Sequence, residues 1–196
     1  ISLLITGDEE GDAVNGTKKV VDYLKKRKEK INFCLVGEPT NPNKLGEMVK
    51  IGRRGSFTAK ISITGKQGHV AYPQWTLNPI DSLTQILNSI ISLKLDEGTE
   101  DFPPSNIEIV KIKSSDGASN VVPQSAEGIF NIRYNVKHSK ESLIKIIDTI
   151  INEQVKNTDY VSNVDYNNSA EPFLTKQGNF TEIIKTSSDE VTGLSA

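Results

Sequence analysis

The stretch SFTAKISIT, residues 56–64, decides the fold of the middle of the chain. Its apolar and polar residues alternate strictly, so the two kinds of side chain point to opposite faces of an extended strand. The pattern predicts a half-buried strand. The residues expected on its buried face are Phe57, Ala59, Ile61 and Ile63.

Five further elements follow this strand along the chain. Asn78 can cap a helix whose first residue is Pro79, and Ser139 can cap a second helix. The order is therefore β-α-β-β-α-β, the ferredoxin-like arrangement. We expect it to form a self-contained domain at 55–167, inserted into another domain. The five elements are a helix at 78–95, strands at 106–113 and 128–136, a helix after Ser139, and a weaker strand at 160–166.

The flanking segments have a different pattern. Two continuous apolar runs, at 1–6 and 31–36, surround an amphipathic helical pattern at 14–30. Continuous apolar runs are typical of parallel strands that are buried on both faces. The sequence therefore predicts part of an α/β layer at 1–54. We expect the chain to return to that layer at 168–196, with a helix near 179–191. Cys34 lies in the second apolar run, and we expect its side chain to pack inside that strand.

Composition limits the class of protein. The chain has 196 residues, 36% of them hydrophobic and 24% charged, with a formal net charge of -2. These values are ordinary for a soluble globular protein and indicate neither a nucleic-acid partner nor a membrane-surface partner. No apolar run approaches the roughly 20 residues that span a bilayer. A single cysteine, Cys34, suits a reducing compartment, so we expect a cytoplasmic protein.

Both ends of the chain look cut. It opens on Ile1, inside the first predicted strand, and it stops directly after the last predicted helix. We therefore expect a fragment of a longer protein.

Three adjacent acids end the first apolar run, in TGDEEG at 6–11. Glu38 follows the second run in the same way, in VGEPT at 36–40. Ligands of α/β layers bind beyond the carboxyl ends of the strands, where these acids lie. One interpretation is a solvated turn; the other is a cation site, because carboxylates bind zinc, cobalt or manganese.

Other polar residues allow two interpretations each. His69 lies in a glycine-flanked loop and is either a surface residue or a functional one. Arg53 and Arg133 can bind a substrate carboxylate or form surface ion pairs. Asn120 can bind a ligand or hold a turn. His138 precedes a helix, and we expect it only to cap that helix or to be solvated.

Five motifs in this order resemble the succinyl-diaminopimelate desuccinylase family, a dimetal amidohydrolase group that includes acetylornithine deacetylase and carboxypeptidase G2. The resemblance extends over essentially the whole chain, and the acidic pair alone would identify only the broader group. The motifs are TGDEEG, VGEPT, the segment from GRRGS to GHVAYP, SNVVP and FNIRY.

The resemblance implies roles for the matching residues. Glu9 would be the general base, while Glu10 and Glu38 would each bind one of two divalent metal ions, zinc or, as the alternative, cobalt. His69 would cross a homodimer to the partner's active site and stabilise the oxyanion. The inserted domain would be the dimerisation domain. The substrate contacts implied are Arg53, Tyr72, Asn120 and Arg133.

The reaction implied is metal-dependent hydrolysis of N-succinyl-LL-2,6-diaminopimelate to succinate and LL-2,6-diaminopimelate, in lysine and cell-wall precursor synthesis. The family's upstream histidine and aspartates and its downstream metal histidine are absent here, so we expect the chain alone to be inactive. Two alternatives stay open. One is a sister amidohydrolase such as acetylornithine deacetylase or an aminoacylase, and the other is a non-catalytic dimerisation module.

Overall fold

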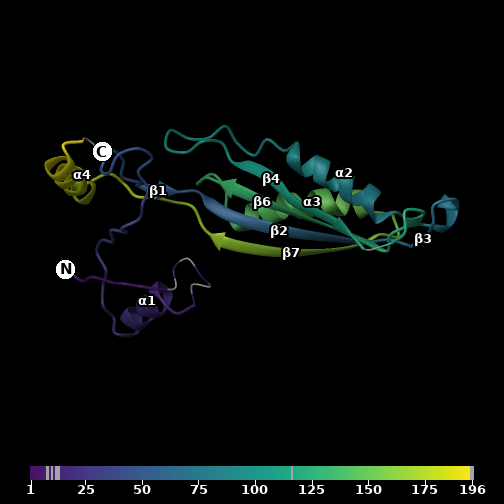
Figure 1. Ribbon diagram of the computed structural model, residues 1–196, viewed down its shortest axis with the longest axis horizontal. Coiled ribbons are helices and arrows are strands. Elements are labelled where there is room, and N and C mark those ends of the chain that lie inside the picture. The colour runs from purple at the N-terminus through teal and green to yellow at the C-terminus, as the bar shows by residue number, and fades with distance from the viewer. Residues whose placement is uncertain (8, 10, 12–13, 116, 195–196) are drawn as a thin grey trace. The chain divides into compact units, whose positions relative to one another are not determined.

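The computed structural model describes the chain except for residues 8, 10, 12–13, 116 and 195–196. Two compact units make up the chain (Figure 1). The first unit consists of Ile1–Val49 and Gly178–Ala196, and the second unit of Lys50–Gln177. Each unit is described separately below.

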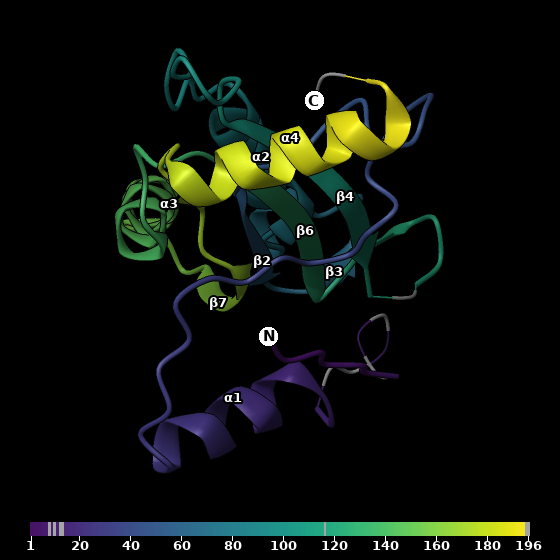
Figure 2. The same cartoon turned by 90° about the vertical axis from the view of Figure 1, so that its left-hand side faces the viewer.

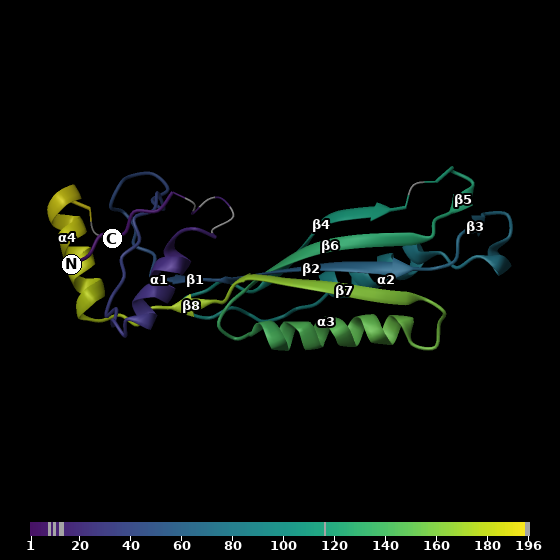
Figure 3. The same ribbon diagram turned by 90° about the horizontal axis from the view of Figure 1, so that it is seen from below.

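A four-stranded antiparallel sheet forms the second unit, with its strands side by side in the order β4-β6-β2-β7 (Figures 2 and 3). Two helices alternate with these strands along the chain, in the order β2, α2, β4, β6, α3, β7. The predicted β-α-β-β-α-β arrangement is therefore confirmed. The elements are β2 (Gly55–Thr64), α2 (Pro79–Ile91), β4 (Asn106–Ser114), β6 (Ser125–Tyr134), α3 (Lys140–Val155) and β7 (Val161–Ala170).

Both helices of the second unit begin at the predicted caps. The Asn78 side chain accepts a hydrogen bond from the backbone N–H of Ile80 at 3.2 Å. The Ser139 hydroxyl accepts one from the N–H of Ser142 at 3.2 Å, and a reciprocal bond completes a capping box.

None of the helices in the described part of the chain is long and apolar enough to cross a membrane.

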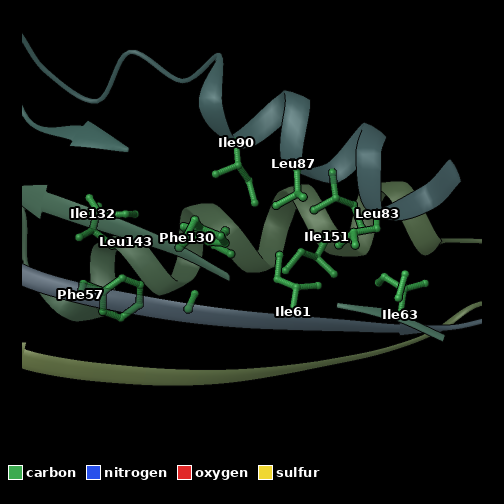
Figure 4. Close-up of a cluster of buried hydrophobic side chains, with 14 of the residues drawn as sticks. Phe57, Ile61, Ile63, Leu83, Leu87, Ile90, Phe130, Ile132, Leu143 and Ile151 are labelled. Atoms are coloured by element: carbon green, nitrogen blue, oxygen red, sulfur yellow. The ribbon is translucent and has the colours of Figure 1, made fainter. Parts of the chain in front are cut away.

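The core of the second unit lies between the sheet and its two helices (Figure 4). The alternation in β2 places Phe57 and Ile61 on the covered face, where both are fully buried. Burying one such side chain contributes about 1.5–3 kcal/mol to folding. The apolar face of the sheet therefore stabilises the unit by packing against the two helices. The opposite face is polar, and there Glu127 forms ion pairs with Lys60 at 3.1 Å and Lys113 at 2.7 Å.

Two short ribbons extend the second unit beyond the two ends of β2 (Figure 1). At the amino end of β2, β1 (Gly52–Arg53) pairs with β8 (Phe173–Leu174). Past its carboxyl end, β3 (Gly68–His69) pairs with β5 (Val121–Val122). The ribbons carry the residues that the sequence analysis selected at 53 and 69.

A buried carboxylate, Asp96, fixes the connection between α2 and β4. It accepts hydrogen bonds from the N–H of Gly98 and the side-chain amide of Asn135, both at 2.6 Å. Burial alone would raise the pKa of Asp96, but hydrogen bonds from Ser105, Gly98 and Asn135 outweigh it and lower the pKa to about 2. His138 lies 3.3 Å from the same carboxylate with 13% of its side chain exposed. The expectation that His138 only caps a helix or is solvated was therefore wrong.

The first unit contains two helices, α1 (Thr17–Lys26) and α4 (Asn179–Thr192). The second agrees with the predicted helix near 179–191, whereas α1 is shorter than the predicted 14–30. Neither apolar run, 1–6 or 31–36, is a strand. A strand needs neighbours for its backbone N–H and C=O groups, and no strand in the described part of the chain pairs with these runs.

Cys34 was predicted to pack inside a strand, and that prediction was wrong. Its side chain is exposed, because the run around it is exposed as well. One aromatic contact involves this run: the ring of Phe33 stacks on that of Phe180 in α4, with centroids 4.6 Å apart.

Candidate functional site

His69 lies at one end of the second unit, with its ring held by two neighbours. The backbone N–H of Ala71 donates to Nδ1 at 3.1 Å. The side-chain amide of Asn120 lies 3.3 Å from Nε2. The ring of Tyr72 is tilted against the imidazole, with centroids 5.8 Å apart. Three residues selected from the sequence, His69, Tyr72 and Asn120, are therefore neighbours, and we call them the histidine end.

Trp75 extends this cluster and was not selected from the sequence. Its ring stacks on Tyr72 at 5.1 Å between centroids, and 62% of the residue is exposed. The contact arises because Pro73–Trp75 forms a short 3-10 helix, η1, which brings side chains three residues apart onto one side. The proline and the three-residue spacing from Tyr72 to Trp75 were the signal available in the sequence.

Arg53 and Arg133 lie at the opposite end of the second unit, which we call the arginine end. Arg133 sits on the polar face of β6, opposite Ser56 of β2 and Asn106 of β4. Arg53 is the last residue of β1, and both arginines are exposed. Within the described part of the chain, neither guanidinium has a hydrogen bond or an ion pair. Both can therefore offer a bidentate fork to a carboxylate.

Arg54 differs from its neighbour Arg53. Its Nη1 donates to the side-chain oxygen of Asn106 at 2.9 Å and to the carbonyl of Pro104 at 3.4 Å. These bonds hold the beginning of β4 against the start of β2. The sequence showed two adjacent arginines, and the structure assigns a structural task to Arg54.

The two ends are far apart within one copy of the chain. Arg133 pairs with Ser56, and the sheet then continues for eight residues to Thr64 before the ribbon that carries His69 begins. At ~3.3 Å per residue, this stretch alone spans about 26 Å. A small substrate as long as four extended residues would cover only about 14 Å. One copy therefore cannot apply both ends to one small molecule.

The predicted acidic site is only partly described. Glu9 and Glu38 lie in the first unit, and both are exposed. Glu10 lies outside the described residues. Among the residues that are described, no three His, Cys, Asp or Glu side chains form a group that could hold a metal ion. The described residues alone therefore do not fit a dimetal centre, which needs at least three protein donors for each ion.

Comparison with known proteins identifies the second unit. Residues 51–159 match the family described as the peptidase dimerisation domain. The chain is 57% identical over 185 residues to succinyl-diaminopimelate desuccinylase of Pelagibacter ubique, covering 94% of this chain and 48% of that protein. It is 43% identical to the protein of the same name from Parvibaculum lavamentivorans, covering 99% and 49%. The chain thus spans about half the length of the curated relatives it matches.

Solved structures agree in fold. The M20 family metallo-carboxypeptidase Sso-CP2 of Sulfolobus solfataricus matches with a TM-score of 0.68 and 13% identity, over 88% of this chain and 59% of that one. Aminopeptidase PepT of Bacillus cereus matches with a TM-score of 0.64 and 14% identity, over 80% and 40%. At these identities the similarity concerns the fold alone.

Proposed function

This chain belongs to the peptidase family that carries this dimerisation domain, and from that premise we propose that the whole protein hydrolyses N-succinyl-LL-2,6-diaminopimelate. The products are succinate and LL-2,6-diaminopimelate. The observation that carries the proposal is the 57% identity to a desuccinylase, which extends over 94% of the chain and thus over both units. The match of residues 51–159 to the peptidase dimerisation domain supports amide hydrolysis as the class of reaction.

Two residues carry the chemistry in this proposal. Glu9 accepts a proton from the attacking water and delivers it to the nitrogen of the leaving amine. The water oxygen bonds to the amide carbon, the C–N bond breaks, and a carboxylate and an amine result. His69 donates a hydrogen bond to the oxyanion that forms between these steps. A donor of this kind is typically worth about 2.7–4 kcal/mol of transition-state stabilisation.

The remaining residues bind the substrate. Arg53 and Arg133 bind carboxylates of the substrate, and their exposed guanidinium groups at the arginine end support this role. Tyr72 and Asn120 contact the substrate from the histidine end, where both adjoin His69. The substrate carries several carboxylates, so two arginines match its charge.

We further propose that each active site uses two copies of the chain. The support is the length of the sheet, about 26 Å between the two ends, because one small substrate cannot reach both within one copy. A homodimer formed by the second unit would supply His69 from one copy and Glu9, Arg53 and Arg133 from the other.

The proposed cofactors are two divalent metal ions, zinc or cobalt. Glu10 would bind one ion and Glu38 the other, and the remaining donors would come from the part of the whole protein that this chain does not include. Carboxylates are suitable ligands for both metals. We place the whole protein in the cytoplasm, because a biosynthetic amidohydrolase acts on metabolites of that compartment and the single cysteine of this chain suits a reducing environment.

Complementation between two inactive variants of the full-length protein tests the proposal. Glu9→Gln and His69→Ala homodimers should each lose nearly all activity. When their subunits exchange, half of the dimers are mixed, and each mixed dimer has one intact site. About a quarter of all sites should therefore recover activity.

Tagged subunits report the exchange, and a protein carrying both substitutions is the matched control. Confirmed exchange with activity still at the level of the parents would refute the shared site. Turnover of succinyl and acetyl substrates side by side tests the substrate: faster turnover of N-acetylornithine would indicate a sister enzyme.

A further inference from the structure

The two ring nitrogens of His69 face different kinds of partner. A backbone N–H can only donate, and that of Ala71 lies 3.1 Å from Nδ1. Nδ1 must therefore present a lone pair, and the neutral ring carries its proton on Nε2. The group that lies 3.3 Å from Nε2 is the side-chain NH2 of Asn120, which can only donate. The Asn120 amide therefore has to present its oxygen instead, so that it accepts from Nε2–H.

The side-chain amide of Asn120 can meet this requirement by a half-turn about its Cβ–Cγ bond. The half-turn exchanges its oxygen and its NH2 group, so the oxygen faces Nε2–H and the NH2 points away. We propose that Asn120 is a positioning residue: its amide oxygen, together with the Ala71 N–H, holds His69 in the form protonated on Nε2. The outward NH2 then remains available to a substrate oxygen.

Backbone hydrogen bonds hold the segments that carry His69 and Asn120 next to each other. The carbonyl of Asn120 accepts a hydrogen bond from the N–H of Val70 at 3.0 Å. His69 and Val121 are paired across the β3–β5 ribbon. The N–H of Tyr72 donates to the carbonyl of His69 at 3.0 Å. Both side chains therefore project from backbone segments that are hydrogen-bonded to each other, so His69 and Asn120 are neighbours without a bound substrate.

The consequence for the reaction rests on the function proposed above. With Nδ1 occupied by the Ala71 N–H, Nε2–H is the only ring group that can donate to the oxyanion. A charged oxygen accepts more strongly than an amide oxygen does, so the Nε2–H bond moves from Asn120 to the oxyanion as negative charge develops. Asn120 thus keeps the proton on the correct nitrogen until it is needed.

Ring 15N chemical shifts of the full-length protein without substrate test the arrangement, because protonated and unprotonated ring nitrogens differ strongly. His69→Gln assigns the signals. We expect the proton of His69 on Nε2 in the native protein and in Asn120→Asp, which keeps an accepting oxygen. In Asn120→Leu the two shifts should move toward those of free histidine. Ser119→Ala, in the same turn, is the matched control and should leave them unchanged.

Activity provides the second measurement. Loss of one hydrogen bond predicts a fall in kcat of about five-fold for Asn120→Leu. A native proton on Nδ1 would overturn the proposal. So would unchanged ring shifts in Asn120→Leu with a raised KM, since Asn120 would then be a substrate contact alone. Altered ring shifts with full activity would support the positioning of His69 and would count against its proposed role at the oxyanion.

Discussion

Leu83 in the second unit is fully buried, whereas Leu35 in the first unit is 63% exposed. The contrast is general, because every buried hydrophobic residue among those described belongs to the second unit. The second unit closes its own sheet, with β2 paired on both sides by strands from within 120 residues of chain. The apolar runs of the first unit have no pairing strand among the described residues. An antiparallel split β-α-β unit is locally self-sufficient, and a parallel strand is not.

Cutting the chain between the units should give the largest effect. We expect residues 50–177 to fold alone, with a cooperative urea transition followed by circular dichroism, because the whole core lies within them. A peptide of residues 1–49 should show no cooperative transition. A cooperative transition in that peptide, or none in 50–177, would contradict the comparison.

Two matched leucine substitutions test the difference in burial between the two units. Leu83→Ala should lower the free energy of unfolding by about 2–5 kcal/mol, because it removes a fully buried side chain and leaves a cavity. Leu35→Ala in the same 196-residue chain should change it by less than about 0.5 kcal/mol, as expected for an exposed position. Urea unfolding of both variants measures the difference. Equal losses would mean that Leu35 is buried in solution.

Acid should lower the free energy of unfolding of the second unit through Asp96, by less than the Leu83→Ala substitution can. Its pKa is about 2 in the folded state against an ordinary value of 3.8, so the unfolded state binds the proton more readily. The stabilisation is complete above pH 4 and is lost as the pH falls toward 2. It amounts to about 2 kcal/mol. Urea unfolding of residues 50–177 between pH 5 and 2 measures it, and Asp96→Asn should flatten that part of the profile. If the free energy of unfolding of Asp96→Asn falls equally steeply with decreasing pH, other carboxylates cause the effect.

The second unit was largely predictable because its signals are local. The capping side chains Asn78 and Ser139 predicted where both helices begin, and the alternation at 57–63 predicted the buried face of β2. The first unit was not, because an apolar run such as 31–36 indicates burial without naming its neighbours. Strand pairing of that kind is a long-range property, which a local pattern does not contain.

The site residues show the same division. Motif resemblance selected His69 and Arg133, but spacing along the chain did not reveal that they lie at opposite ends of a sheet. That separation follows only from the register. The hydrogen bonds of Arg54 to Asn106 and Pro104 join residues about fifty positions apart, so no local pattern could have separated Arg54 from Arg53.

The stacking of Trp75 on Tyr72 gives the histidine end an optical property. Trp75 is the single tryptophan of the chain, and 62% of it is exposed. Indole emission shifts to shorter wavelength when water leaves the ring. Closure of another surface over the histidine end would therefore change the fluorescence of this chain without any added dye, and the emission spectrum would report the fraction of molecules in which the histidine end is covered.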